Sequence, residues 1–148
     1  GHIDIIERAS RIFDELVVCV FYNPTKAKGM FTVKEREVML KEATKHIKNV
    51  RVTTYTGLLN EFCEKEKIGF VVRGLRAFGD FEYELQRALL LKSLNKNLET
   101  VFIMTNPQYS YVSSSGVREL AAFGGKVKDI VPACVAKKIE NKFKEKKK

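Results

Sequence analysis

The sequence is poor in the features that define disulfide scaffolds, metal clusters and membrane spans. It contains three cysteines, Cys19, Cys63 and Cys134, which are odd in number, far apart and without the spacing of metal ligands. This pattern argues against a disulfide framework and a zinc site, and predicts buried free thiols in a cytosolic protein. No apolar run approaches the roughly 20 residues that a membrane-spanning helix needs. We therefore expect no membrane partner.

Acidic residues are outnumbered by basic ones. The 148 residues include 27 Lys and Arg against 18 Asp and Glu, for a formal net charge of +9, and 45% of them are hydrophobic. This length and composition fit one globular domain with its own core. The excess positive charge suits an anionic partner, either nucleic acid or a phosphorylated small molecule. Because residues 142–148 hold five of the lysines, we expect a solvated basic tail after a domain of residues 1–141.

Helical and strand-like patterns alternate along the chain. Apolar residues at three- and four-residue spacing predict helices, short continuous apolar runs predict buried strands, and a β-rich, partly alternating run at 50–55 predicts a further strand. The predicted order is helix 2–14, strand 16–22, helix 32–47, strand 50–55, a helix ending near 67, strand 68–72, helix 80–94, strand 100–105, a helix from 113–115 to 123, and helix 132–143. Strict alternation of this kind predicts right-handed crossovers and a doubly wound parallel sheet in an α/β fold.

Two helix starts carry capping signals. Thr32 and Glu35 have the spacing of a capping box, and Asp80 is a residue type favoured at the N-cap. The apolar spacing within these two helices predicts that several side chains face the core, including Val38, Met39, Phe81, Leu85 and Leu89.

A basic turn between a strand and a helix is the strongest functional signal. Arg73 and Arg76 lie three residues apart around Gly74, at the predicted end of a strand. A turn at the carboxyl edge of an α/β sheet presents groups that bind anions, and arginine can bind two oxygens of one phosphate. The alternative is structural ion pairing with an acidic residue of the following helix, namely Asp80, Glu82 or Glu84.

Three further segments are suited to phosphate. His2 lies at a helix start, where it could donate a hydrogen bond to a phosphate as charge builds in a transition state, although the pair Gly1-His2 could also remain from a cleaved expression tag. Lys26 and Lys28 lie in a glycine-containing loop after a strand and could instead be solvated. The serines at 113–115 could either cap a helix or bind phosphate.

The basic turn resembles the signature of bacterial phosphopantetheine adenylyltransferases. The matching blocks are Arg73-Gly-Leu-Arg-Ala77 and Asp80-Phe-Glu-Tyr-Glu84, and Gly1-His-Ile-Asp-Ile-Ile6 is similar to the second half of the family's Thr/His-x-Gly-His motif. Segments at 23–26, 30–36, 109–115 and 121–125 fit in the same order. The resemblance therefore covers essentially the whole chain.

The resemblance implies that the phosphate of 4′-phosphopantetheine attacks the α-phosphorus of ATP, giving dephospho-coenzyme A and pyrophosphate with Mg²⁺ as cofactor. Positioning and charge stabilisation carry such a reaction, which agrees with a sequence that shows cationic groups but no nucleophile–base pair. The implied catalytic residues are His2, Lys26 and Arg76. The implied acceptor-binding residues are Lys26, Leu59 and Arg73. The implied ATP contacts are His2, Gly74, Leu75, Arg76, Glu84, Tyr109, Ser110, Tyr111, Val112, Ser113, Ser114 and Ser115.

The resemblance also implies a cytoplasmic homohexamer with dephospho-coenzyme A or coenzyme A as product or feedback ligand, and no nucleic acid. It implies a Rossmann-like sheet of five strands in which the first, central strand precedes Gly1. Loss of a central strand would cost more than the range of about 5–15 kcal/mol by which domains are stable. We therefore expect residues upstream of Gly1, and an intact mass near 16.9 kDa would contradict this expectation.

Two other functions stay open at this stage. One is a related nucleotidyltransferase that acts on nicotinamide mononucleotide, or on an alcohol phosphate with CTP; the blocks at 73–77 and 80–84 argue against it. The other is a non-catalytic basic module that binds nucleic acid. Its support is the charge and the lysine-rich tail, but the sequence has no helix-turn-helix, zinc or aromatic RNA-binding motif.

Overall fold

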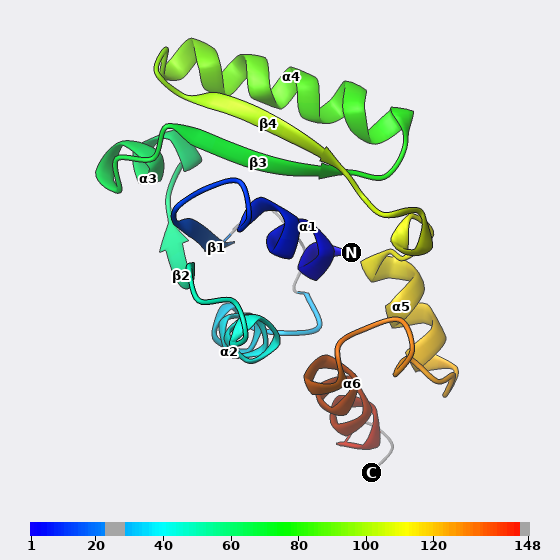
Figure 1. Cartoon of the computed structure of the whole chain (residues 1–148). Coiled ribbons are helices and arrows are strands. Elements are labelled where there is room, and N and C mark those ends of the chain that lie inside the picture. The colour runs from blue at the N-terminus through cyan, green and yellow to red at the C-terminus, as the bar shows by residue number, and fades with distance from the viewer. Residues whose placement is uncertain (23–28, 146–148) are drawn as a thin grey trace.

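A computed structural model of the chain describes residues 1–22 and 29–145. Helices and strands alternate as the apolar pattern predicts (Figure 1). The elements are α1 (His2–Ala9), β1 (Leu16–Tyr22), α2 (Val33–Thr44), β2 (Val50–Thr56), α3 (Leu59–Lys65), β3 (Phe70–Leu75), α4 (Phe78–Leu94), β4 (Glu99–Met104), a 3₁₀ turn η1 (Pro107–Tyr109), α5 (Ser114–Ala122) and α6 (Ala133–Glu145).

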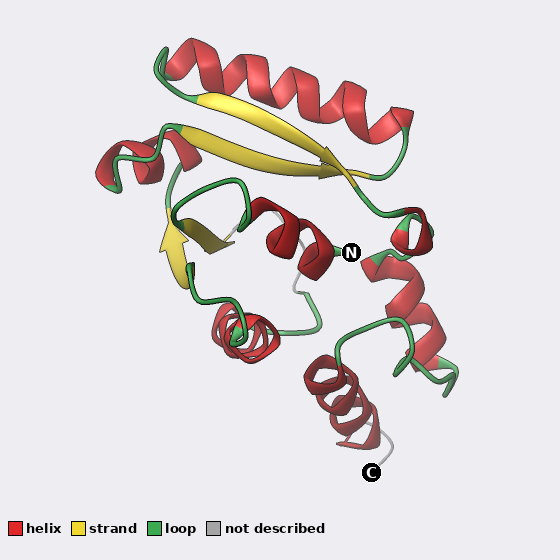
Figure 2. Ribbon diagram, in the orientation of Figure 1, coloured by secondary structure: helices red, strands yellow, loops and turns green. Residues whose placement is uncertain are grey.

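The strands form two parallel pairs. β1 pairs with β2 and β3 pairs with β4, each along its whole length (Figure 2). Within residues 1–22 and 29–145, neither pair is hydrogen-bonded to the other. The parallel α/β fold is therefore confirmed, whereas these residues form two separate two-stranded sheets instead of one continuous sheet. The additional central strand stays a prediction.

Helices cover both faces of the β3–β4 sheet, as a doubly wound arrangement requires. α4 lies along one face and α1 lies toward the other (Figure 1). On the α4 side, the rings of Phe81 and Phe102 are 5.6 Å apart. On the α1 side, a methyl group added at Gly74 would lie 2.9 Å from Cγ1 of Ile5. Because successive strand residues point to opposite faces, the Arg73 side chain lies on the α4 side of the sheet and Gly74 faces α1.

The last two helices have a small core of their own. α5 and α6 lie next to each other beyond the end of β4 (Figure 1). Their shared apolar cluster contains Val117, Ala121, Val127, Ala136 and Ile139. None of the helices in the described part of the chain is long and apolar enough to cross a membrane.

Three predicted boundaries near the site are wrong. α1 ends at Ala9 instead of near residue 14, because the Asn49 side chain donates to the Ser10 and Phe13 carbonyl oxygens at 2.8 and 2.9 Å and holds an irregular turn there. β3 continues past residue 72 to Leu75, since its pairing with β4 extends that far. α4 begins at Phe78 after the N-cap Ala77, so Asp80 lies in the first helical turn and is not the cap.

Several burial predictions are also wrong. Phe81, Leu85 and Leu89 on α4 and Val38 on α2 are exposed, Leu89 by 62%. A two-stranded sheet is too narrow to cover the whole apolar side of α4, and this explains why Phe81, Leu85 and Leu89 stay exposed. Met39 is buried, and the Thr32–Glu35 capping box is present, as predicted. All three cysteines are free, but only Cys63 is fully buried; Cys19 and Cys134 are half-buried.

Candidate active site

The start of α1 is held against the loop that follows β4. The Arg8 guanidinium donates to the Met104 carbonyl oxygen at 2.6 Å and to the Asp4 carboxylate at 3.3 Å. Asp4 also accepts a hydrogen bond from the backbone N–H of Asn106 at 3.2 Å. These contacts join residues about a hundred positions apart and bring the first turn of α1 to the carboxyl end of the β3–β4 sheet.

His2 is the first residue of α1 and faces this edge. Its neighbour Gly1 lies beside the loop, since a methyl group there would be 3.6 Å from Cβ of Tyr109. His2 keeps an exposed surface, yet partial desolvation by the surrounding protein lowers its pKa, and the positive charge of Arg76 lowers it further. The imidazole is therefore neutral near pH 7 and has one N–H to donate.

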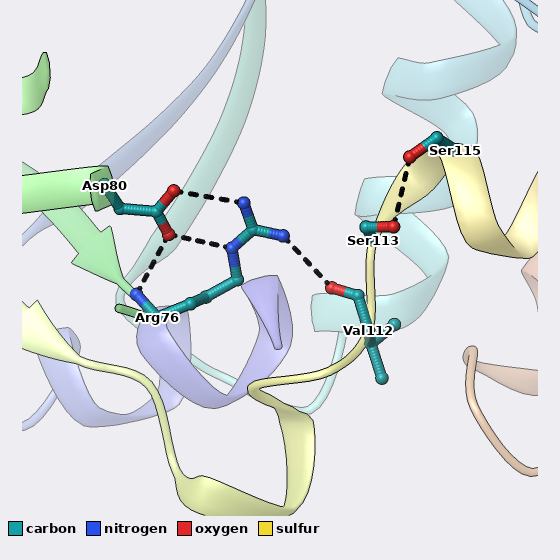
Figure 3. Close-up of polar contacts among 5 residues, drawn as sticks. All are labelled: Arg76, Asp80, Val112, Ser113 and Ser115. Carbon is teal, nitrogen blue, oxygen red and sulfur yellow. Dashed lines mark hydrogen bonds and ion pairs between the residues drawn. The ribbon is translucent and has the colours of Figure 1, made fainter. Parts of the chain in front are cut away.

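Arg76 joins the turn after β3 to the loop after β4 (Figure 3). Its guanidinium donates to both carboxylate oxygens of Asp80, at 2.9 and 3.2 Å, and its backbone N–H donates to the same carboxylate at 3.1 Å. The third guanidinium nitrogen reaches the Val112 carbonyl oxygen at 3.4 Å. The hydrogen bonds between the two side chains raise the pKa of Arg76 and lower that of Asp80.

The serine-rich loop is ordered by its own hydrogen bonds. Ser113 is the N-cap of α5, and its hydroxyl accepts from the Gly116 backbone N–H at 3.1 Å. The Ser113 and Ser115 hydroxyls are 3.1 Å apart (Figure 3), and Ser110 donates to the Pro107 carbonyl oxygen at 2.8 Å. Tyr111 is 74% exposed. The loop thus presents hydroxyl groups beside Arg76 at a helix start, an arrangement suited to phosphate oxygens.

Arg73 is held differently from Arg76. It lies within β3 and not after it, and its Nε is 3.3 Å from Oε2 of Glu84 on α4. The Arg73 side chain is 29% exposed and that of Glu84 is 19% exposed. Burial lowers the pKa of Arg73, and the Glu84 carboxylate opposes this effect. Structural ion pairing, one alternative left open by the sequence, is therefore present for both arginines.

The other residues implied by the resemblance differ in their surroundings. The α1 face of Gly74 is occupied by Ile5, and the Leu75 side chain is buried, so their side-chain positions serve packing. Leu59 is half-buried at the start of α3, a helix that lies away from the start of α1 and from α5 (Figure 1). Lys26 lies outside the described residues. Its two roles and the role of Leu59 therefore stay predictions.

Sequence reasoning missed the anchor formed by Asp4 and Arg8. Their spacing of four residues is visible in the sequence and is typical of a helical ion pair. Their contacts with Met104 and Asn106 depend on the tertiary structure alone.

A cleft of about 670 Å³ lies beside the serine-rich loop, between α5, α6 and the entry to α2, and Ser115, Arg118 and Lys142 contribute to its lining. Of the candidate site residues described above, Ser115 alone lines this cleft. In the described part of the chain, no group of three or more His, Cys, Asp or Glu side chains is arranged to hold a metal ion.

Comparison with known proteins identifies the family. The family model described as cytidylyltransferase-like matches residues 1–120. A phosphopantetheine adenylyltransferase of Caldanaerobacter subterraneus subsp. tengcongensis is 48% identical over 145 residues, which cover 98% of this chain and 90% of that protein. Proteins of the same name from Clostridium botulinum and Clostridium tetani are 48% and 49% identical, over 99% and 89% of this chain and 89% and 82% of their own length. The chain therefore belongs to the cytidylyltransferase-like nucleotidyltransferases and, among them, to the phosphopantetheine adenylyltransferase family.

Proposed function

We infer that this protein transfers the adenylyl group of ATP to 4′-phosphopantetheine, giving dephospho-coenzyme A and pyrophosphate, a step of coenzyme A biosynthesis. The observation that carries this conclusion is the identity of 48% to a phosphopantetheine adenylyltransferase over 98% of the chain. The clustering of His2, Arg76 and the serine-rich loop at one sheet edge supports it, because the phosphates of a nucleoside triphosphate need several hydrogen-bond donors close together.

The proposed mechanism uses positioning and charge stabilisation. A phosphate oxygen of the acceptor attacks the α-phosphorus of ATP, and the bond from that phosphorus to the pyrophosphate oxygen breaks. The N–H of neutral His2 donates to an oxygen of the α-phosphate as negative charge builds there. Arg76 contributes positive charge on the nucleotide side, and hydroxyl and backbone N–H groups of residues 109–115 hold the β- and γ-phosphates.

The acceptor is proposed to bind on the other side of the basic turn. Arg73 and Lys26 hold its phosphate, and Leu59 contacts the pantetheine arm. The proposed ATP contacts of Gly74 and Leu75 are made by their backbone groups, since their side-chain positions are engaged in packing.

Magnesium is proposed to enter with ATP. Mg²⁺ in such sites is held by substrate phosphates together with one or two carboxylates, not by a protein cage. The two carboxylates described at this edge are already engaged, Asp80 with Arg76 and Asp4 with Arg8 and the Asn106 N–H, so the described residues do not form a ready ligand set.

Pyrophosphate release with different acceptors tests the proposal. The protein with ATP and Mg²⁺ should release pyrophosphate in the presence of 4′-phosphopantetheine, and not with nicotinamide mononucleotide or with an alcohol phosphate plus CTP. Turnover with either alternative acceptor but not with 4′-phosphopantetheine would overturn it. Oligonucleotide binding that weakens steeply with salt, without any turnover, would favour the nucleic-acid module instead.

We also propose a cytoplasmic homohexamer that binds dephospho-coenzyme A or coenzyme A as product or feedback ligand. Exposed leucines along α4, including Leu89 and Leu94, provide an apolar surface that subunit contacts would bury. Free cysteines suit a reducing compartment. Sedimentation equilibrium would test the hexamer, and a monomer at micromolar concentration would contradict it.

A further inference from the structure

One face of α1 runs antiparallel to the segment that follows β4. The Arg8 guanidinium donates to the Met104 carbonyl oxygen at 2.6 Å. One helical turn earlier, the Asp4 carboxylate accepts from the Asn106 backbone N–H at 3.2 Å. The two side chains are also bonded to each other at 3.3 Å, as residues four apart on one helix face can be. The pair therefore binds the last carbonyl of β4 and the N–H two residues further on.

The same contacts reach the groups of the candidate active site. Asn106 is the N-cap of η1, and η1 ends at Tyr109, where the serine-rich loop begins. Gly1, the N-cap of α1, faces Tyr109, since a methyl group there would lie 3.6 Å from its Cβ atom. Figure 1 shows the N-terminal end of α1 directed at this segment. His2 follows Gly1 directly, so the contacts of Asp4 hold both His2 and the start of the loop.

The position of α1 depends on such tertiary contacts. The helix has eight residues, too few for a helix to be stable in isolation. Ile5 provides an apolar contact with Gly74 of β3, and Asp4 and Arg8 provide the polar contacts with the segment after β4. The Asp4 side chain is 13% exposed, and its Oδ2 atom accepts from both Arg8 and the Asn106 N–H. Its geometry is that of a carboxylate used to join two elements.

We propose that Asp4 and Arg8 are positioning residues for adenylyl transfer. They fix the start of α1 against the segment after β4, and thereby set the position of His2 relative to the serine-rich loop, without contacting either substrate. This inference rests on the proposed function, in which His2 donates to the α-phosphate while the loop holds the β- and γ-phosphates. Both must act on one ATP molecule, so their relative position decides whether the transition state receives its hydrogen bond.

Steady-state kinetics of single and double variants test this role. Asp4→Ala and Arg8→Ala should each lower kcat by about ten- to a hundredfold, the loss expected when a catalytic group is displaced by about 1 Å. The KM for 4′-phosphopantetheine should stay within about twofold, because the proposed acceptor contacts lie elsewhere. In the His2→Ala background, Asp4→Ala should lower kcat by no more than about threefold, since the pair acts through His2. The full loss in that background would overturn the proposal.

Arg11→Ala is the matched control. Arg11 is an exposed arginine three residues after Arg8 and forms no ion pair in the described part of the chain. Its replacement should leave kcat and both KM values within about twofold, and a loss equal to that of Arg8→Ala would overturn the proposal. Asp4→Asn keeps an oxygen that can accept from the Asn106 N–H but loses the charge beside Arg8, so its kcat should lie between those of the wild type and Asp4→Ala. If Asp4→Ala does not fold, Asp4→Asn replaces it in the double variant.

An NMR titration of His2 gives a readout that needs no turnover. The chain has two histidines, and His46→Ala assigns the remaining signal to His2. Partial desolvation and the charge of Arg76 lower the pKa of His2. In Asp4→Ala this pKa should rise toward the ordinary value of about 6.5, because His2 leaves those surroundings. Removal of a negative charge alone would lower the pKa, so a rise reports displacement.

The two failures are distinct. An unchanged or lower pKa of His2 in Asp4→Ala would overturn the positioning role, whatever the activity. A wild-type protein without adenylyl transfer, in which Asp4→Ala still raises this pKa, would overturn the proposed function and leave the structural coupling between α1 and the segment after β4 in place.

Discussion

The two arginines of the basic turn are each paired with a carboxylate, but the pairs differ in range and in exposure. Arg76 and Asp80 are four residues apart, form a two-point contact, and are 43% and 30% exposed. Arg73 and Glu84 are eleven residues apart, on a strand and a helix, and meet at a single contact between side chains that are 29% and 19% exposed. The first pair is local and its members are hydrogen-bonded to each other, whereas the second joins a strand to a helix and leaves the buried Oε2 of Glu84 without a hydrogen bond in the described residues.

This difference indicates separate tasks for the two arginines. An exposed ion pair contributes little to stability, with a typical value of about 0–1 kcal/mol, and can rearrange at low cost. A half-buried pair with open donors is more costly to disturb and more responsive to a ligand. We therefore expect the Arg76 side chain to change its contacts when the nucleotide binds, while Arg73 is preorganised to bind the phosphate of the acceptor.

Removal of His2 should give the largest effect on the nucleotide side. His2→Ala should lower kcat by about 10²–10³, the usual loss for one transition-state donor, with little change in either KM. Steady-state kinetics measure this. His46→Ala is the control, because His46 bonds to Glu7 at 2.8 Å, outside the proposed site, and should leave kcat within about threefold, far below the effect of a catalytic group. Equal losses in the two variants would remove His2 from the mechanism.

Removal of Arg73 should come next. Arg73→Ala should weaken 4′-phosphopantetheine binding by about ten- to a hundredfold and lower the free energy of unfolding by about 1–3 kcal/mol, because Glu84 is left without its partner. The fold should stay intact. Isothermal titration and urea denaturation measure the two effects. Unchanged binding would remove Arg73 from the acceptor site and end the contrast with Arg76.

Gly74→Ala tests the opposite face of the same strand. The added methyl group would lie 2.9 Å from Cγ1 of Ile5, so the Ile5 side chain or α1 as a whole must shift, at a cost of about 1–3 kcal/mol. Since α1 carries His2, kcat should also fall. Thermal denaturation and kinetics in parallel check this prediction. A variant as stable and as active as the wild type would show that the contact between α1 and β3 does not position His2.

Asp80→Asn should have a smaller effect than any of these changes. The exposed pair should contribute less than about 1 kcal/mol to stability. Because Asn can keep one hydrogen bond to Arg76, the KM for ATP should change by no more than about threefold. A loss of stability as large as that of Arg73→Ala would contradict the distinction between the local and the tertiary pair.

The dependence of stability on pH should show the smallest effect of the series. The Arg76 contact lowers the pKa of Asp80, so the ionised carboxylate favours the folded state. Its contribution is complete above the ordinary aspartate pKa of about 3.9 and is lost as the pH falls through the lowered value. The difference in unfolding free energy between the wild type and Asp80→Asn should therefore be constant from pH 7 to 5 and shrink below pH 4. A difference that grows on acidification would contradict this assignment.

The sequence predicted the elements more reliably than their ends and faces. Apolar runs fall where β1, β3 and β4 are found, because buried parallel strands need apolar residues on both faces, and the partly alternating run at 50–55 falls where β2 is found. The end of β3 was missed because hydrogen bonding to β4 carries the strand through Arg73 and Gly74, residues without strong strand propensity. The inward faces of α4 were missed because burial depends on how wide a sheet the helix covers.

For the candidate site, too, some features followed from the sequence and others from the tertiary structure. The sequence by itself determined which groups are available: two arginines around Gly74, a histidine at a helix start and a run of hydroxyl residues before another helix. Such local patterns follow from residue type and spacing. Only the tertiary structure decided that Asp4 and Arg8 dock the start of α1 onto the loop after β4, and that Glu84, among three nearby carboxylates, pairs with Arg73. These choices depend on the crossing of helices and strands distant in sequence, which no local pattern specifies.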